Sequence, residues 1–267
     1  MFRKLLKHEF RATRGFLGIA CAAAIGSGLL GGASLRYLTY AAETQPDANV
    51  SIVFFALALV AAFLALFTSC IAMLVMQVGR FYNSRFTDEG YLTFTLPVSG
   101  HQILLSSLVS GVVNVIIVWL VMVVSFFLLI YLGVSGTPGF AEEFWPELGE
   151  FFRRLGAEIR MHHVGMILET ILVALVSAVA EGCVIMLSVT LGALKAKKHK
   201  ILAAFGFYYL IHVVLSILST VAMARFAFYQ DFEFYLEMGI TGLGALVIAA
   251  ACYFPTHYLV TRRLNLP

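Results

Sequence analysis

The sequence predicts an all-α integral membrane protein with six transmembrane helices. Of its 267 residues, 61% are hydrophobic and only 12% are charged, whereas a soluble domain has about 45–50% apolar and about 25% charged residues. Several apolar runs exceed the roughly 18 residues that indicate a membrane-spanning helix. Short polar segments separate these runs, so we expect residues 1–267 to form a single transmembrane domain.

The first 14 residues predict an amphipathic helix at the membrane interface. Phe2, Leu5, Leu6 and Phe10 recur at helical spacing, and five basic residues occupy the remaining face. A basic face opposite an apolar one suits a helix that lies in the plane of the membrane surface. The apolar run that follows is too long for a signal peptide, so we interpret it as an uncleaved first span.

The apolar runs give the six spans and the segments between them. The predicted spans cover residues 15–40, 50–78, 101–132, 164–194, 201–224 and 238–260. Gly28 and Gly32, in the first span, have the four-residue spacing that lets another helix approach closely. The longest break, residues 133–163, contains a predicted amphipathic helix over residues 142–159.

The distribution of Lys and Arg predicts the orientation. If the N-terminus is cytoplasmic, 13 of the 18 basic residues fall in cytoplasmic segments and 5 on the opposite side. Cytoplasmic loops carry an excess of Lys and Arg, so we expect both termini in the cytoplasm. Residues 79–100 then face the cytoplasm, and residues 133–163 face outward.

Residues 79–100, GRFYNSRFTDEGYLTFTLPVSG, are the candidate partner-binding segment. Acidic residues suit the first turn of a short helix, and a proline disfavours helical geometry at and before its own position. The aromatic and leucine side chains between them would supply an apolar contact surface, with arginines at its rim. The residues assigned to this surface are Arg85, Asp88, Glu89, Tyr91, Leu92, Phe94, Leu96 and Pro97; the alternative is an ordinary loop whose aromatics lie against the lipid headgroups.

Three polar residues fall inside predicted spans. Glu169 and Glu181 are in the fourth span and His212 is near the middle of the fifth. A carboxylate there costs about 2.5–3.5 kcal/mol on insertion scales and is usually functional or paired. We expect a structural contact between Glu181 and His212, or alternatively a role for Glu181 in a transport path, whereas Glu169 can reach the headgroups.

No pattern of residues predicts catalysis, a cofactor or a metal site. The chain lacks the GxxxxGK[ST] phosphate loop, the HExxH zinc pair and the GxSxG nucleophile elbow. The two glutamates of the fourth span are 12 residues apart, about 18 Å along a helix, so they do not form an acid pair. The four cysteines lie in apolar runs without CxxC spacing, which favours buried free thiols.

The run Asp88–Gly100, DEGYLTFTLPVSG, followed by HQILL, resembles the permease subunits of ABC-2-type ATP-binding-cassette exporters. In that family the segment between the second and third spans carries an acidic residue, a leucine-rich patch and a Leu-Pro-hydrophobic-Ser/Thr motif. The matching residues here are Glu89, Leu92, Leu96, Pro97, Val98, Ser99, Ile103 and Leu104. The resemblance extends to the basic N-terminal helix, the six spans and the cytoplasmic ends.

The resemblance implies a function that the residues alone do not. It implies that residues 79–100 form a coupling helix on a separate ATPase subunit, which binds ATP and Mg²⁺, while this chain binds no cofactor. It also implies a second permease subunit, identical or related, and a place in a bacterial plasma membrane, with no nucleic-acid partner. Peptide antibiotics, lipids and glycans all remain open as the exported substrate.

Two other classes of function also remain open. One is a membrane enzyme, such as a protease or acyltransferase, that uses Glu181 and His212. The other is an immunity or sensor protein that binds a peptide through residues 133–163.

Overall fold

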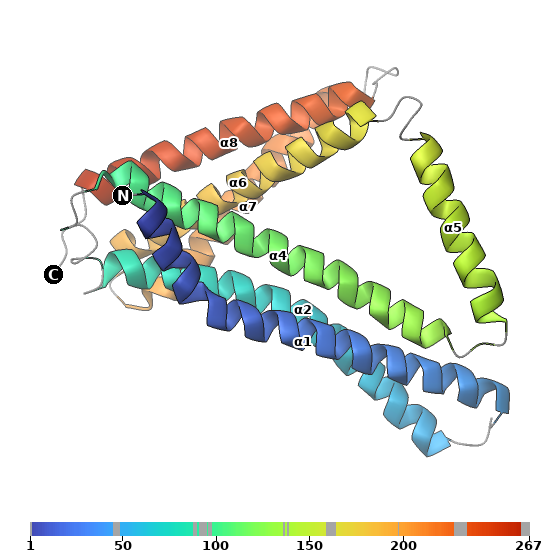
Figure 1. The fold of residues 1–267 in the computed structure, drawn as a ribbon. Coiled ribbons are helices and arrows are strands. Elements are labelled where there is room, and N and C mark those ends of the chain that lie inside the picture. Colours follow the sequence, from blue (N-terminus) through green and yellow to red (C-terminus); the bar gives the residue numbers. More distant parts are fainter. Residues whose placement is uncertain are drawn as a thin grey trace. The chain divides into compact units, whose positions relative to one another are not determined.

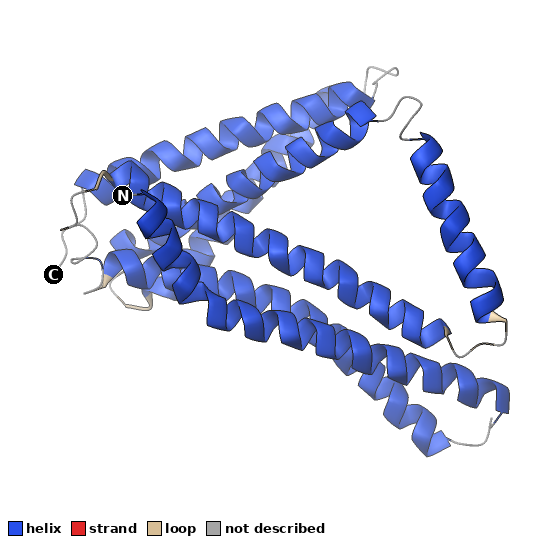
Figure 2. Cartoon of the chain, viewed as in Figure 1, coloured by secondary structure: helices blue, strands red, loops and turns tan. Residues whose placement is uncertain are grey.

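The computed structural model of the chain is helical throughout its described part (Figures 1 and 2). It describes residues 2–44, 49–87, 90, 95, 98–135, 137, 139–158, 164–196, 198–226 and 234–262. These residues form seven helices, and none of them lies in a strand. The helices are α1 Phe2–Thr44, α2 Asn49–Phe86, α4 Gly100–Val134, α5 Phe140–Glu158, α6 Val164–Lys195, α7 Lys200–Phe226 and α8 Phe234–Arg262.

Six of these helices are long and apolar enough to cross a membrane, which confirms a multi-pass membrane protein; only α5 among the seven is not. Their surfaces agree with this assignment, because large apolar side chains are exposed along them. On α2, for example, Leu57 and Leu64 are 65% and 63% exposed. Contiguous exposed apolar surface on this scale is expected against lipid rather than water.

Two boundaries differ from the sequence-based ones. Residues 2–14 and 15–40 belong to one uninterrupted helix, α1. The predicted polar segment 79–100 begins as helix, because α2 continues to Phe86. Residues 80–86 contain no glycine or proline to end the helix, and Arg80 and Arg85 both pair with Glu9. Gly90 N donates to the Thr87 carbonyl 2.8 Å away in the turn beyond α2.

The chain divides into two compact units. The first unit comprises Met1–Arg11, Met76–Val113 and Val164–Pro267, and the second comprises Ala12–Val75 and Asn114–His163. Helices α1, α2 and α4 each contribute residues to both units, α5 belongs to the second, and α6, α7 and α8 belong to the first.

The second unit is built on close contacts among α1, α2 and α4. Ala24, Leu66 and Leu129 form its buried core. Gly28 faces the α4 backbone, where an added Cβ would lie 2.6 Å from the Ser125 carbonyl oxygen, and a Cβ on Gly32 would lie 2.7 Å from the Leu132 Cβ. The prediction that this glycine pair lets a second helix approach closely is therefore confirmed.

Helix α5 is amphipathic and contacts the end of α4 through aromatic rings. The ring of Tyr131 lies 5.7 Å from that of Phe140 and 5.4 Å from that of Phe144, centroid to centroid. On the exposed side, hydrogen bonds from Arg153 and then Arg154 lower the pKa of Glu150 below its ordinary value. This helix corresponds to the one predicted over residues 142–159.

In the first unit, α6 lies against both α7 and α8 (Figure 1). Gly192 permits a close contact with α7, since an added Cβ would lie 2.6 Å from the Ala204 nitrogen. A tight turn connects α6 and α7, and His199 adopts the left-handed conformation there with φ of 55°. The short connection places the two helices antiparallel, so residues equally far from the turn lie at the same depth.

Candidate functional site

The candidate site lies where α2 ends and α4 begins, at the two ends of the predicted partner-binding segment. Helix α4 starts at Gly100, and Ser99 precedes it as an N-cap whose hydroxyl accepts from Gln102 N at 3.4 Å. Beyond α2, Gly90 lies against the helix end, where an added Cβ would be 2.4 Å from the Arg85 carbonyl oxygen. Seven of the predicted contact residues lie outside the described residues, namely Asp88, Glu89, Tyr91, Leu92, Phe94, Leu96 and Pro97.

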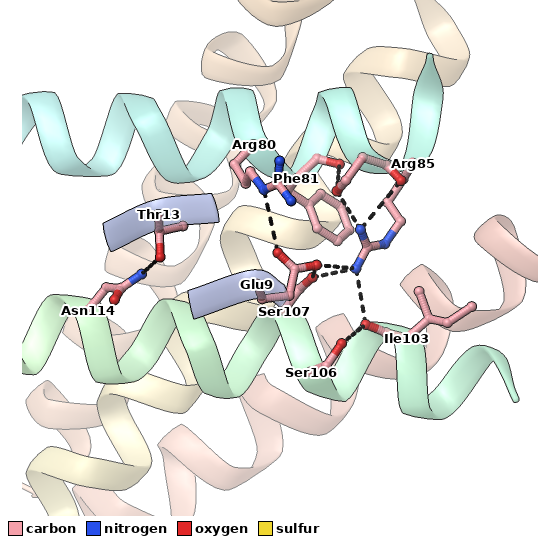
Figure 3. Close-up of polar contacts among 10 residues, drawn as sticks. Glu9, Thr13, Arg80, Phe81, Arg85, Ile103, Ser106, Ser107 and Asn114 are labelled. Carbon is pink, nitrogen blue, oxygen red and sulfur yellow. Dashed lines mark hydrogen bonds and ion pairs between the residues drawn. The ribbon is translucent and has the colours of Figure 1, made fainter. Parts of the chain in front are cut away.

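Arg85, the remaining predicted contact residue, is buried in the last turn of α2. The residue is 1% exposed. Its Nη2 donates to Glu9 Oε1 at 3.2 Å, to the Ile103 carbonyl at 3.1 Å and to the Ser107 hydroxyl, and its Nη1 donates to Ser84 (Figure 3). The guanidinium carbon also lies 5.6 Å from the centre of the Phe81 ring, within range of a cation–π contact.

Glu9 is the acidic centre of the same cluster. Its Oε1 accepts from Arg85 and, at 3.0 Å, from the Ser107 hydroxyl, and its Oε2 lies 3.5 Å from Arg80 Nε. Glu9 comes from the N-terminal turns of α1, the arginines from the end of α2 and Ser107 from the start of α4 (Figure 3). We call Glu9, Arg80, Arg85 and Ser107 the helix-end cluster.

The helix-end cluster joins three helices that are distant in sequence. Charge-assisted hydrogen bonds are about twice as strong as neutral ones, and here they are shielded from solvent. The cluster contains two cations and one anion, and the Nε atoms of Arg80 and Arg85 are buried without a hydrogen bond within the described chain. It is therefore a rigid junction with an excess of positive charge.

The burial of Arg85 corrects one sequence-based assignment. We expected Arg85 to present its charge at the rim of a partner-binding surface, but its side chain is only 2% exposed and is bound within the chain. Arg85 instead positions the two helix ends from which the segment departs. Arg80, with a side chain 23% exposed, is the arginine that reaches the surface.

A second polar cluster links α6 and α7 within the membrane-spanning part. The Tyr208 hydroxyl donates to Glu181 Oε1 at 2.5 Å, and His212 Nε2 lies 3.3 Å from the same oxygen. The predicted contact between Glu181 and His212 is thus confirmed. Glu169 is half-buried and lies 12 residues before Glu181 on α6, about 18 Å along the helix, so it is not part of this cluster.

The sequence analysis missed two groups that the structure brings together. Tyr208 is one turn before His212 on α7, and this i, i+4 spacing was the available signal. His101, at the start of α4, stacks on His257 of α8 with ring centres 3.6 Å apart, and its Nδ1 lies 3.1 Å from the Tyr253 hydroxyl. His101 precedes His257 by 156 residues and Tyr253 by 152 residues, so no local pattern in the sequence indicated these contacts.

The chemistry of both clusters is that of ion pairs and hydrogen bonds. Among the described residues no group of three or more His, Cys, Asp or Glu side chains is placed to hold a metal ion. All four cysteines are free thiols, and Cys183 and Cys252 are buried.

No family model, curated protein or solved structure matches the chain.

Proposed function

We propose that this chain is the permease subunit of an ABC-2-type ATP-binding-cassette exporter. It lies in a bacterial plasma membrane with both termini in the cytoplasm and pairs with a second permease subunit, identical or related. A separate ATPase subunit binds ATP and Mg²⁺ and docks on residues 79–100. The chain itself catalyses no reaction and moves a substrate out of the cytoplasm or the membrane.

The helix-end cluster is the observation that carries this proposal. Its arginines lie in the first residues of the proposed docking segment, at the end of α2, and Arg85 binds Ile103 and Ser107, which lie directly after the segment. Both ends of the segment are therefore held to each other and to Glu9. A force applied to the segment by a partner would move the ends of α2 and α4 as one body rather than deform a loose loop.

The N-terminal turns of α1 are connected to the ends of α2 and α4 through Glu9. Arg3, Lys4 and Lys7 are exposed, whereas Leu5 and Leu6 are half-buried and Glu9 is buried. This pattern suits turns that lie at the membrane surface with their basic side toward anionic headgroups. Because Glu9 binds Arg85, movement of the docking segment would be passed to these turns.

Purification of the tagged chain from its native membrane tests the proposal. We expect a protein carrying GxxxxGK[ST] to co-purify in stoichiometric amount and to hydrolyse ATP. The double substitution Glu89→Ala with Leu92→Ala removes an acidic and an apolar side chain from the docking segment. It should reduce the co-purified ATPase by about tenfold or more, the effect of losing roughly 1.4 kcal/mol or more of binding free energy.

The matched control is Glu147→Ala with Leu148→Ala, which makes the same two changes in α5. This variant should retain the ATPase, because α5 is proposed to face outward. Equal recovery of the ATPase with both double variants would disprove docking on this segment. Recovery of no ATPase with the wild-type chain would disprove the permease assignment itself.

A membrane enzyme is the second candidate, because Glu181 and His212 are in contact within the membrane-spanning part. A carboxylate can orient an imidazole that acts as a general base. The purified chain, without any ATPase, would then cleave or acylate a membrane-embedded substrate. Glu181→Gln would abolish that reaction, and the ATPase experiment above would give no partner.

A further inference from the structure

The Glu181 cluster lies deep in the membrane-spanning part of the first unit. Glu181 is 14 residues before the end of α6 at Lys195, and His212 is 12 residues after the start of α7 at Lys200. At 1.5 Å per residue these separations correspond to about 21 Å and about 18 Å. Both helices thus place the cluster near the middle of a hydrocarbon core about 30 Å thick.

The carboxylate of Glu181 is only half satisfied by its neighbours. Both hydrogen-bond partners, Tyr208 and His212, contact Oε1. Within the described chain Oε2 accepts no hydrogen bond, and the side chains of Glu181 and His212 are each 38% exposed. One carboxylate oxygen therefore remains open on the surface of the unit at a depth where lipid cannot solvate it.

The chain contains no strong cation at this depth to balance the charge. No Lys or Arg occurs between residues 161 and 194 or between residues 201 and 224, which include the whole of α6 before Lys195 and most of α7. The span of α8 has none between residues 226 and 261. A second copy of the chain would bring the same helices and the same shortage of cations.

We infer that Glu181 binds a cationic hydrogen-bond donor, a primary ammonium or guanidinium group, carried by an amphipathic molecule. The donor occupies Oε2, and the apolar part of the molecule lies along the exposed side chains of α6 and α7. The inference rests on the proposed function, since it names the substrate class of the permease as cationic amphiphiles.

The other titratable groups around Glu181 do not supply the cation that would balance its charge. They are Tyr208 and His212 from α7 and Cys252 from α8. Tyr208 and His212 contact only Oε1, and neither carries the permanent positive charge of a Lys or Arg side chain. A bound ammonium group makes the cluster neutral, which is the state that a low-dielectric environment favours.

Binding of dodecylammonium to the purified chain in phosphatidylcholine nanodiscs tests this inference. Phosphatidylcholine has no N–H donor, so the lipid does not compete for Oε2. Isothermal titration should show saturable binding of dodecylammonium and only unsaturable partitioning of dodecanol, which has the same chain length and no charge.

The variant Glu181→Gln keeps the shape of the side chain and removes its charge. We expect it to weaken dodecylammonium binding about 10- to 100-fold, as expected for a lost charge-assisted hydrogen bond. Glu169→Gln, the same change on the same helix, should bind as the wild type does. Equal binding by Glu181→Gln and Glu169→Gln, or equal behaviour of dodecylammonium and dodecanol with the wild type, would overturn the inference.

A change of lipid distinguishes a membrane lipid from a free amphiphile as the natural ligand. If the amine of a membrane lipid is the natural ligand, nanodiscs containing phosphatidylethanolamine will lower the apparent affinity for dodecylammonium in the wild type but not in Glu181→Gln. If the ligand is a free amphiphile, the lipid change will have no such effect. The assay needs no ATPase, so its failure leaves the permease assignment intact, and a failure of ATPase co-purification does not alter the binding result.

Discussion

Arg85 and Glu9 show how single buried charges can fix a junction between helices. Removing one member of a buried ion pair is strongly destabilising, at about 3–5 kcal/mol, because the other charge stays uncompensated. The two members here are not equivalent. Without Arg85, Glu9 keeps Arg80 and Ser107 as partners, but without Glu9 both arginines lose the carboxylate that they share.

A double-mutant cycle measures this asymmetry. We expect Glu9→Leu to lower the unfolding temperature of the detergent-solubilised chain more than Arg85→Met does. The unfolding temperature of the double variant should fall by less than the sum of the two single effects. Each substitution removes the unpaired buried charge that the other one creates. Lys7→Met, a change of an exposed cation on the same helix, is the control and should have little effect. Additive single effects would contradict the assigned pairing.

The same residues mark the limit of what the sequence could predict. Glu181 and His212 were predicted as partners because both are polar and both lie mid-span, where the alternatives to pairing are costly. Arg85 was misplaced at the surface because its ligand, Glu9, lies 76 residues away. A charged residue such as Arg85 indicates the end of a span in the sequence. Its burial becomes visible only from contacts between helices.

At the scale of helices, close packing in the second unit depends on glycines that expose the backbone of α1. The six apolar runs and the helix of residues 142–159 could be predicted, because length and hydrophobicity determine them. The ends of α1 and α2 could not, since the polar turns that prolong them are stabilised by contacts in the fold. The four-residue glycine spacing indicated a helix contact without indicating that α4 provides it.

Gly28→Ala tests the contact between α1 and α4. The new methyl group would meet the Ser125 carbonyl oxygen at 2.6 Å, and relieving such overpacking costs about 1–3 kcal/mol. We expect a lower unfolding temperature. Gly26→Ala is the control, since a Cβ there meets nothing within 4 Å, and the higher helix propensity of alanine should leave stability unchanged or raise it. An equal effect of both substitutions would argue against the close contact.

At the scale of the whole molecule, the proposed orientation puts α5 outside and the turn between α6 and α7 inside. Gly149 in α5 and Lys198 in the turn are both exposed, so a cysteine at either position is available to a reagent. The positive-inside pattern predicts opposite sides of the membrane for them.

Labelling of intact cells with a membrane-impermeant maleimide tests the orientation. We expect Gly149→Cys to be labelled in intact cells and Lys198→Cys only after lysis. The wild-type chain provides the background, since its four cysteines lie within the apolar helices. The reverse pattern would place the docking segment outside, where no ATPase could reach it.

The helix-end cluster also constrains the order in which the chain can assemble during synthesis. Ser107 is 98 residues after Glu9, so at about 5–20 residues per second a ribosome needs roughly 5–20 s to deliver it. Until Ser107 has been made, the partners of Glu9 within this cluster are the two arginines of α2. The complete helix-end cluster can therefore form only after the start of α4 has been synthesised.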